Sequence, residues 1–150
     1  MKTAILFLAF ALQAPAALAD QCGSIVHDLR TNGATIEPSK TEDIFFVSLA
    51  EAGGVQLMCY HAFADFYAES AERRPSPGFF TSLAHMASVT DGGSADEIRD
   101  ALAACGGIAV ARKSDEHVKV PFSRGKVDCH VLSGPSAQFR VEVYKAGEEP

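Results

Sequence analysis

The sequence is poor in basic residues and lacks the common motifs of enzymes. It contains 13 Lys and Arg against 19 Asp and Glu, which gives a formal net charge of −6. A net-acidic chain has no general electrostatic attraction to nucleic acid or to anionic membranes. The sequence also has no G-x-S-x-G nucleophile elbow, no glycine-rich phosphate-binding motif and no H-E-x-x-H metal motif. These absences argue against the most familiar hydrolase, nucleotide-binding and metalloprotease classes.

No apolar run reaches the length of a membrane span, but a short one lies at the N-terminus. Lys2 is followed by an uncharged apolar stretch at residues 4–12 and by Ala-Leu-Ala at 17–19. This order is typical of a secretory signal peptide, whereas a buried N-terminal helix is the alternative. We expect residues 1–19 to be removed before Asp20, leaving 150 − 19 = 131 residues, 12 of them basic and 19 acidic. The sequence therefore predicts a secreted or periplasmic protein without a membrane span.

The four cysteines form an even set within the part predicted to be exported. They are Cys22, Cys59, Cys105 and Cys129, and none of their spacings is C-x-x-C or typical of a zinc site. We therefore expect two structural disulfides and neither a redox pair nor a bound metal or other cofactor. Three pairings are possible. We favour Cys22–Cys59 and Cys105–Cys129, which would tie the N-terminal segment to a central helix and a second helix to a sheet.

The stretch 55–70 shows a helical hydrophobic period. Apolar residues recur three and four positions apart from Val55, and Cys59 lies on their stripe. This pattern predicts a core helix with a disulfide at Cys59. His61, Asp65 and Glu69 follow one another at steps of four on the opposite side. We interpret them as a solvated face rather than a metal site, because a third convergent ligand is missing.

Four further helices are expected before residue 107. One spans 94–107, where Ser94 and Glu97 have the spacing of a capping box and two glycines end the segment. A similar box, Ser39 and Glu42, opens a predicted helix over 39–54, although its alternation also fits a strand. Shorter helices are expected at 22–33 and 78–88.

After residue 107 the period changes to that of strands. Strands are expected at 108–112, 117–122, 126–133 and 139–145, separated by short polar or Gly-Pro connections. The predicted fold class is α+β in one domain, residues 20–150. A helical layer of about 22–105 would pack on one face of a C-terminal antiparallel sheet of three or four strands, about 107–146, stapled by disulfides.

Alternation along these strands assigns their residues to two faces. One set is apolar and should lie under the helices: Val118, Val120, Val127, Cys129, Val131, Phe139, Val141 and Val143. The other set is polar or amphipathic and should lie on the opposite face: His117, Lys119, Asp128, His130, Arg140, Glu142 and Tyr144.

The polar set has the parts for phosphoryl-transfer chemistry. His117, His130 and Glu142 could exchange protons while Arg140 holds the phosphate, provided that His130 and Glu142 lie close together. Small secreted ribonucleases carry sets of this general kind on a sheet, but no stretch aligns with a motif of theirs. The alternative is a solvated or partner-binding face, with Lys119, Asp128 and Tyr144 among its contacts.

The hypothesis favoured by the sequence is an exported, disulfide-stabilised binding protein without catalysis. It would act as an effector, toxin, inhibitor or envelope accessory factor on another protein or a cell-surface component. A ribonuclease-like hydrolase that uses the polar sheet face is the second hypothesis. A carrier for a small apolar ligand, held between helices and sheet, is the third.

Overall fold

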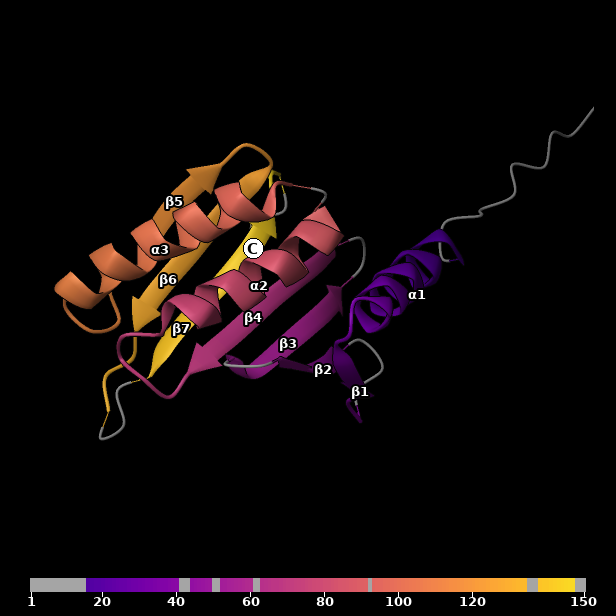
Figure 1. Cartoon of the computed structure of the whole chain (residues 1–150), viewed down its shortest axis with the longest axis horizontal. Helices are drawn as coiled ribbons and strands as arrows, with labels where there is room; N and C mark the ends of the chain where they lie inside the picture. Colours follow the sequence, from indigo (N-terminus) through magenta and orange to yellow (C-terminus); the bar gives the residue numbers. More distant parts are fainter. Residues whose placement is uncertain are drawn as a thin grey trace, which may run out of the picture.

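The fold is known from a computed structural model, which describes residues 16–40, 44–49, 52–60, 63–91, 93–134 and 138–147. These residues form three helices and seven strands, in the order shown in Figure 1. None of the described helices is both long enough and apolar enough to cross a membrane. The elements are α1 (Ala16–Thr31), β1 (Thr35–Pro38), β2 (Ile44–Leu49), β3 (Ala52–Tyr60), β4 (Phe63–Ser70), α2 (Pro77–Asp91), α3 (Ala95–Ala111), β5 (Val118–Phe122), β6 (Gly125–Val131) and β7 (Phe139–Lys145).

The described strands form one antiparallel sheet in the order β1-β2-β3-β4-β7-β6-β5. The first four strands are neighbours in sequence order, and so are the last three. The two groups meet where β4 pairs with β7, with Phe66 opposite Val143. Because α2 and α3 lie between the groups in sequence, this pairing joins segments about 70 residues apart along the chain.

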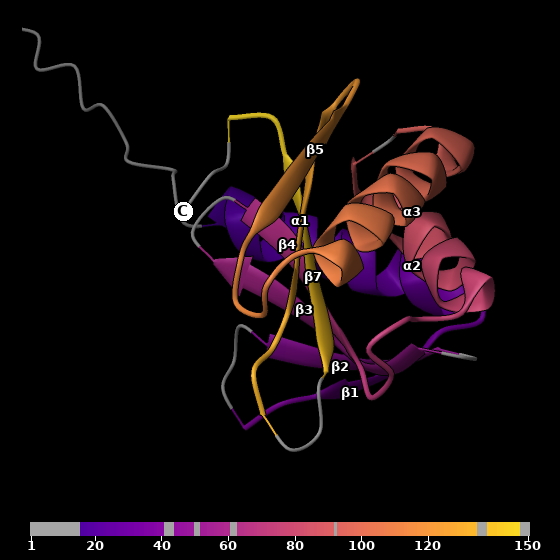
Figure 2. The same ribbon diagram turned by 90° about the vertical axis from the view of Figure 1, so that its left-hand side faces the viewer.

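The helices α2 and α3 cover one face of the sheet (Figure 2). Helix α1 packs against α2 and against β1, the strand at one edge of the sheet. Phe79 and Phe80 of α2 stack edge to face with Phe139 of β7 in the buried layer between helices and sheet. In Figure 2, α2 and α3 lie together on one side of β5, β6 and β7. We call the side of the sheet turned away from α2 and α3 the outer face.

The sheet is larger than the sequence predicted, because the supposed core helix at 55–70 is two strands. Val55 and Leu57 of β3 are buried, and so are Phe66 and Ala68 of β4, at the period of two expected for strands. The sequence fitted a helical period because Met58 and other amphipathic residues lie on the outer face, and together with the buried residues they recur at the spacing of a helix. The expected order, helices first and sheet last, is therefore wrong.

Within the segment 39–54, the described residues 44–49 and 52–54 lie in strands rather than in a capped helix. In β2, Val47 is buried while Phe46 is exposed, and both β1 and β3 pair with this strand. Alternation and cross-strand pairing thus outweigh the capping-box spacing, whose Glu42 lies outside the described residues. Gly54, expected to end a helix, lies within β3.

The predicted strand at 108–112 is instead the C-terminal end of α3. The helix runs through Gly106 and Gly107 because its buried side continues from Cys105 to Ala109. Gly106 lies against α2, where a Cβ atom would be 2.7 Å from Cζ of Phe80. This glycine is therefore needed for close packing of the two helices, and it does not end α3.

The other three predicted helices are present with different bounds: α1 begins at Ala16 rather than Cys22, and α2 and α3 extend beyond their expected C-terminal ends. Helix α1 ends at Thr31 and is followed by Gly33, which has a φ of 89°, while the amide of Ala34 donates to the carbonyl of Leu29. Helix α3 begins after Ser94, but the Ser94 side chain makes no capping bond. Instead, the Glu97 carboxylate accepts hydrogen bonds from the amide and hydroxyl of Ser123, each 2.7 Å long. These bonds tie α3 to the turn between β5 and β6.

Both favoured disulfide pairings are present. Cys22–Cys59 joins α1 to β3 across a Cα–Cα distance of 6.2 Å. Cys105–Cys129 joins α3 to β6 across 5.9 Å. Each bond therefore connects a helix to the sheet.

Candidate functional site

The alternation predicted for β5, β6 and β7 is confirmed. Of the eight residues expected under the helices, Val120 is half-buried and the other seven are buried. The polar set therefore lies on the outer face, where the register aligns His130 with Arg140 and Asp128 with Glu142. His130 and Glu142 are thus diagonal neighbours rather than the directly opposed pair that acid–base exchange would favour.

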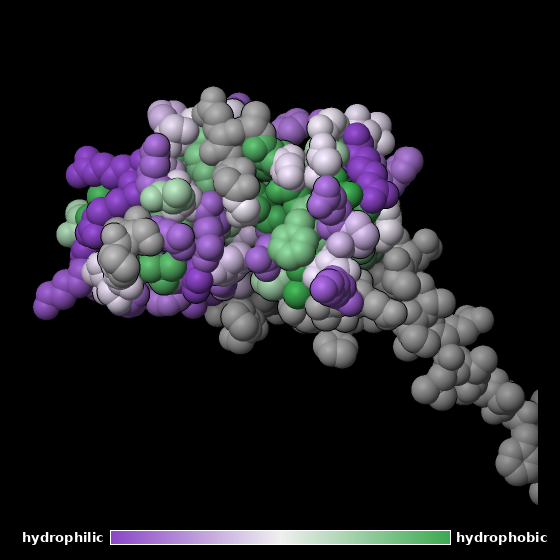
Figure 3. Space-filling model, turned by 90° about the horizontal axis from the view of Figure 1, so that it is seen from below, coloured by the Kyte–Doolittle hydropathy of each residue, from purple (hydrophilic) through white to green (hydrophobic). Residues whose placement is uncertain are grey.

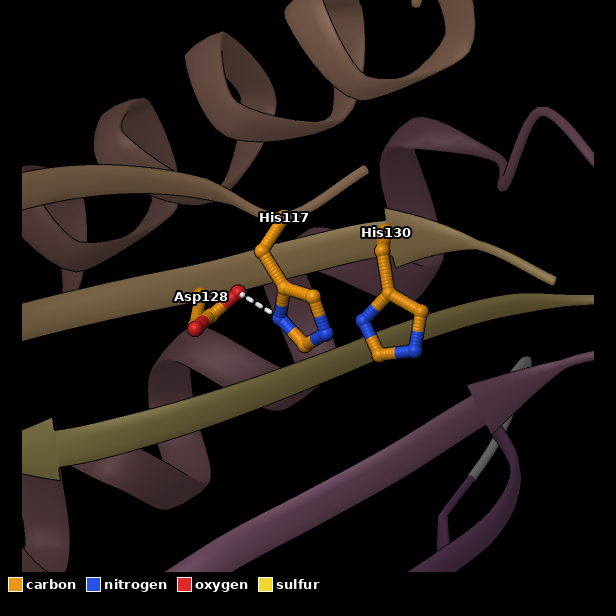
Figure 4. A group of neighbouring side chains, drawn as sticks. All are labelled: His117, Asp128 and His130. Carbon is orange, nitrogen blue, oxygen red and sulfur yellow. Dashed lines mark hydrogen bonds and ion pairs between the residues drawn. The ribbon is translucent and has the colours of Figure 1, made fainter. Parts of the chain in front are cut away.

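Asp128 is the centre of the first group of contacts. Its Oδ1 lies 2.9 Å from Nδ1 of His117, and its Oδ2 lies 3.8 Å from Nζ of Lys119. The Asp128 side chain is only 7% exposed, whereas His117 and Lys119 are each 55% exposed. A buried carboxylate therefore contacts two exposed side chains of the β5 region, and Figure 4 shows its contact with His117.

His130 lies beside His117, with ring centroids 4.1 Å apart and planes tilted by 34°. It is a buried side chain on the outer face. Burial lowers the pKa of His130 below its usual value, and repulsion from His117 lowers it further. At neutral pH His130 is therefore an uncharged imidazole with a lone pair on one ring nitrogen.

The second group of contacts crosses from β7 to β4. Nε and Nη2 of Arg140 donate to Oε1 of Glu69 at 3.1 and 2.7 Å, and the Tyr67 hydroxyl donates to the same oxygen at 2.7 Å. These hydrogen bonds, first that from Tyr67 and then that from Arg140, lower the pKa of Glu69. Burial and the bond to Glu69 raise the pKa of Tyr67 to about 12. Near neutral pH, Glu69 is therefore an acceptor and Tyr67 a donor.

A third contact lies on β7 itself. The Tyr144 hydroxyl donates to Oε2 of Glu142. Burial, followed by this bond, raises the pKa of Tyr144. Like Tyr67, Tyr144 is a protonated donor over the physiological range, so neither tyrosine is available as a base.

The sequence identified seven members of this site and missed Tyr67 and Glu69. Both were assigned to a helix, and only their place on β4 brings them to Arg140. One signal was present: Asp65 and Glu69 are four residues apart, a spacing that puts them on one side of a helix and equally on one side of a strand. His61, weighed with them as a metal ligand, lies outside the described residues.

A pocket on the helical side of the molecule is separate from this site. It is lined by Arg74, Phe80, Gly106 and small residues of α3. The lining is mostly apolar and brings no second titratable side chain near Arg74. The described side chains that form a cluster of ionisable groups, His117, Asp128 and His130, lie on the outer face instead.

Carboxylates outnumber cations on the described outer face. They are Glu37, Asp65, Glu69, Asp128 and Glu142, against Lys119, Lys126 and Arg140. This excess favours cationic over anionic ligands. Figure 3, which looks at the molecule from below rather than onto the outer face, shows hydrophilic side chains toward both ends and hydrophobic ones between them. Comparison of the chain with protein-family models, with curated proteins and with solved structures finds no match.

Proposed function

We propose that this chain is exported and binds a basic protein surface through the outer face of its sheet, without catalysing a reaction. The observation that carries the proposal is the excess of carboxylates on the outer face, which is turned away from α2 and α3. A partner rich in Lys and Arg would complement this charge.

Phe46 supports the proposal because it supplies an apolar contact beside the charges. It is 46% exposed on β2, and its cross-strand neighbours on the outer face are Glu37 and Gln56. An exposed aromatic ring next to a carboxylate suits an Arg or Lys side chain, which packs on the ring and pairs with the acid. We assign Phe46 and Glu37 to the centre of the partner contact.

Export is supported by the two disulfides, which form and persist in oxidising compartments. With the signal-like residues 1–19, they suggest a secreted or periplasmic protein. Intact-mass analysis of protein from the culture medium or periplasm should give a chain that begins at Asp20. A chain that retains Met1 would contradict export by this route.

The partner contact is tested by site-specific photo-crosslinking in the producing cell. A photoreactive residue at Gln56 should capture a protein that the same residue at Ala103, exposed on α3, does not. The captured protein is then purified and titrated with this chain. Binding should weaken as salt rises, because screening reduces the attraction between opposite charges.

Matched variants then test whether binding depends on the outer face rather than on the rest of the surface. Phe46→Ala should weaken binding roughly tenfold or more, as loss of a central aromatic contact does. Ile108→Ala, at a comparably exposed residue of α3, should leave binding unchanged. Glu37→Lys should weaken it as well, whereas Glu72→Lys in the loop after β4 should not. Equal effects of Phe46→Ala and Ile108→Ala would refute the proposal.

A ribonuclease-like activity is the second candidate, favoured by the adjacent His117, His130 and Arg140. Against it, Arg140 is already bonded to Glu69, and Asp128 and Glu142 lie beside the imidazoles. These carboxylates would repel the anionic phosphorane that such an enzyme must stabilise. We expect no RNA cleavage between pH 4 and 8. Cleavage that falls roughly a hundredfold in His130→Ala would establish the hydrolase instead.

A further inference from the structure

We propose that His117 and His130 bind a divalent transition-metal ion, with Asp128 as the carboxylate that orients His117. This site goes beyond the proposed partner contact and does not depend on it. Among the described residues, these three side chains each offer a ligand atom, and the three atoms lie within 4.8 Å of one another. Imidazole and carboxylate groups are common ligands of such ions.

The backbone places the two imidazoles as a cross-strand pair. Val118 of β5 is opposite Cys129 of β6, so His117 and His130, one residue further on each side, are the next neighbours. Side chains at such positions lie close enough to share a ligand. The strand that carries His130 is also held by the Cys105–Cys129 disulfide to α3. His130 is therefore held on a strand that is anchored to α3, and His117 lies directly before the strand β5 that pairs with it.

Asp128 selects the form of His117 that can bind a metal. Its Oδ1 accepts a hydrogen bond from Nδ1 of His117 at 2.9 Å, which leaves the lone pair on Nε2. Figure 4 shows the ring nitrogen of His117 that is not bonded to Asp128 on the side facing His130, and a nitrogen of His130 facing it. A carboxylate that orients a metal-binding histidine in this way is a common feature of metal sites.

The charges around His117 and His130 favour a bound cation, and the types of ligand atom determine which cation binds. Lys119 and Arg140 are close, but each is already engaged by a carboxylate, Asp128 and Glu69 respectively. With Glu142 opposite Asp128, the carboxylates exceed the nearby cations by one. Two imidazole nitrogens suit Zn²⁺ or Cu²⁺, whereas Mg²⁺ and Ca²⁺ prefer oxygen ligands. Water would complete the coordination of the ion.

The test is a calorimetric titration of the purified, disulfide-bonded protein, free of any affinity tag, with ZnCl₂. We expect one ion per chain and no binding of Ca²⁺ or Mg²⁺ under the same conditions. His117→Ala and His130→Gln should each abolish or strongly reduce binding. Asp128→Asn should weaken it about 10- to 100-fold, as loss of an orienting carboxylate does. Bound Cu²⁺ should show coupling to imidazole nitrogen in its electron paramagnetic resonance spectrum, and His117→Ala should remove it.

His85→Ala is the matched control, because His85 is an exposed histidine of α2 away from the outer face. It should bind Zn²⁺ like the unaltered protein. His117 is exposed and precedes β5, so its replacement leaves the fold intact even if His130→Gln does not fold. Absence of Zn²⁺ binding by the unaltered protein would overturn the proposal. So would binding that survives His117→Ala, or that falls equally in His85→Ala.

Discussion

Glu69 is the residue on which the polar side chains of β4 and β7 converge. One oxygen of its carboxylate accepts hydrogen bonds from Tyr67 and from two nitrogens of Arg140. All these donors favour the ionised form, so the pKa of Glu69 in the folded protein is below its ordinary value of 4.5. The stabilisation that follows is present above that value and is lost as the pH falls through the lowered pKa.

The lowered pKa of Glu69 leads to a prediction for the stability of Glu69→Gln. At pH 7 the variant should unfold more easily than the parent protein, by about 1 kcal/mol, since the side chain is 34% exposed and solvent screens the pair. The difference should shrink as the pH falls below 4.5, because the parent carboxylate becomes protonated. Urea unfolding at pH 7 and pH 3 measures both values. Glu72→Gln, in the exposed loop after β4, is the control, and a pH-independent difference for Glu69→Gln would contradict the argument.

At the scale of elements, α3 carries two adjacent glycines with opposite surroundings. Gly106 faces Phe80 and Phe139 in the buried layer, whereas a Cβ atom at Gly107 would meet no heavy atom within 4 Å. Gly106 is required by the packing between α2 and α3. Gly107 has no such packing role, and it only adds backbone freedom to the unfolded chain, which makes the helix less stable.

Alanine substitutions should therefore have effects of opposite sign. Gly106→Ala places a methyl group against Phe80 and should destabilise the protein by about 1–3 kcal/mol. Gly107→Ala should stabilise it by about 0.5–1 kcal/mol, since alanine favours a helix over glycine. Denaturant unfolding of both variants provides the measurement. Destabilisation by both would show that the helix, rather than its packing against α2, is sensitive at this point.

The elements that could be predicted are those whose hydrophobic pattern fits only the period of a strand or only the period of a helix. The strands β5, β6 and β7 alternate strictly, so their two faces and most of the candidate site follow from sequence. The strands β3 and β4 carry amphipathic residues such as Met58 and Tyr67 on the outer face, which makes the apolar spacing fit a helix as well. Only pairing with distant strands decides between the two, and that information is not local. The contact of Glu69 with Arg140 was missed for this reason.

At the scale of the whole molecule, the two disulfides differ in burial. Cys105 and Cys129 are fully buried between α3 and β6, whereas Cys22 and Cys59 are half-buried where α1 meets β3. Reduction requires a thiolate to reach a sulfur atom, so access determines which bond opens first.

We expect Cys22–Cys59 to be reduced before Cys105–Cys129 when the folded protein is treated with a mild thiol reductant. Alkylation of the freed thiols at successive times, followed by peptide mass spectrometry, gives the order. Removal of either bond by paired substitution should cost about 2–4 kcal/mol of stability. Simultaneous opening of both bonds would mean that reduction follows global unfolding instead of local access.

The pairing of β4 with β7 also determines when the outer face forms during folding. Strands β1 to β4 form contacts between sequence neighbours and can assemble early, but β7 follows β4 only about 70 residues later in the chain. Closing so long an intervening segment is a slow, entropically costly event in folding. Because Arg140 meets Glu69 across this junction, the complete set of polar contacts arises only in the final step. Partly folded chains would therefore carry an incomplete outer face.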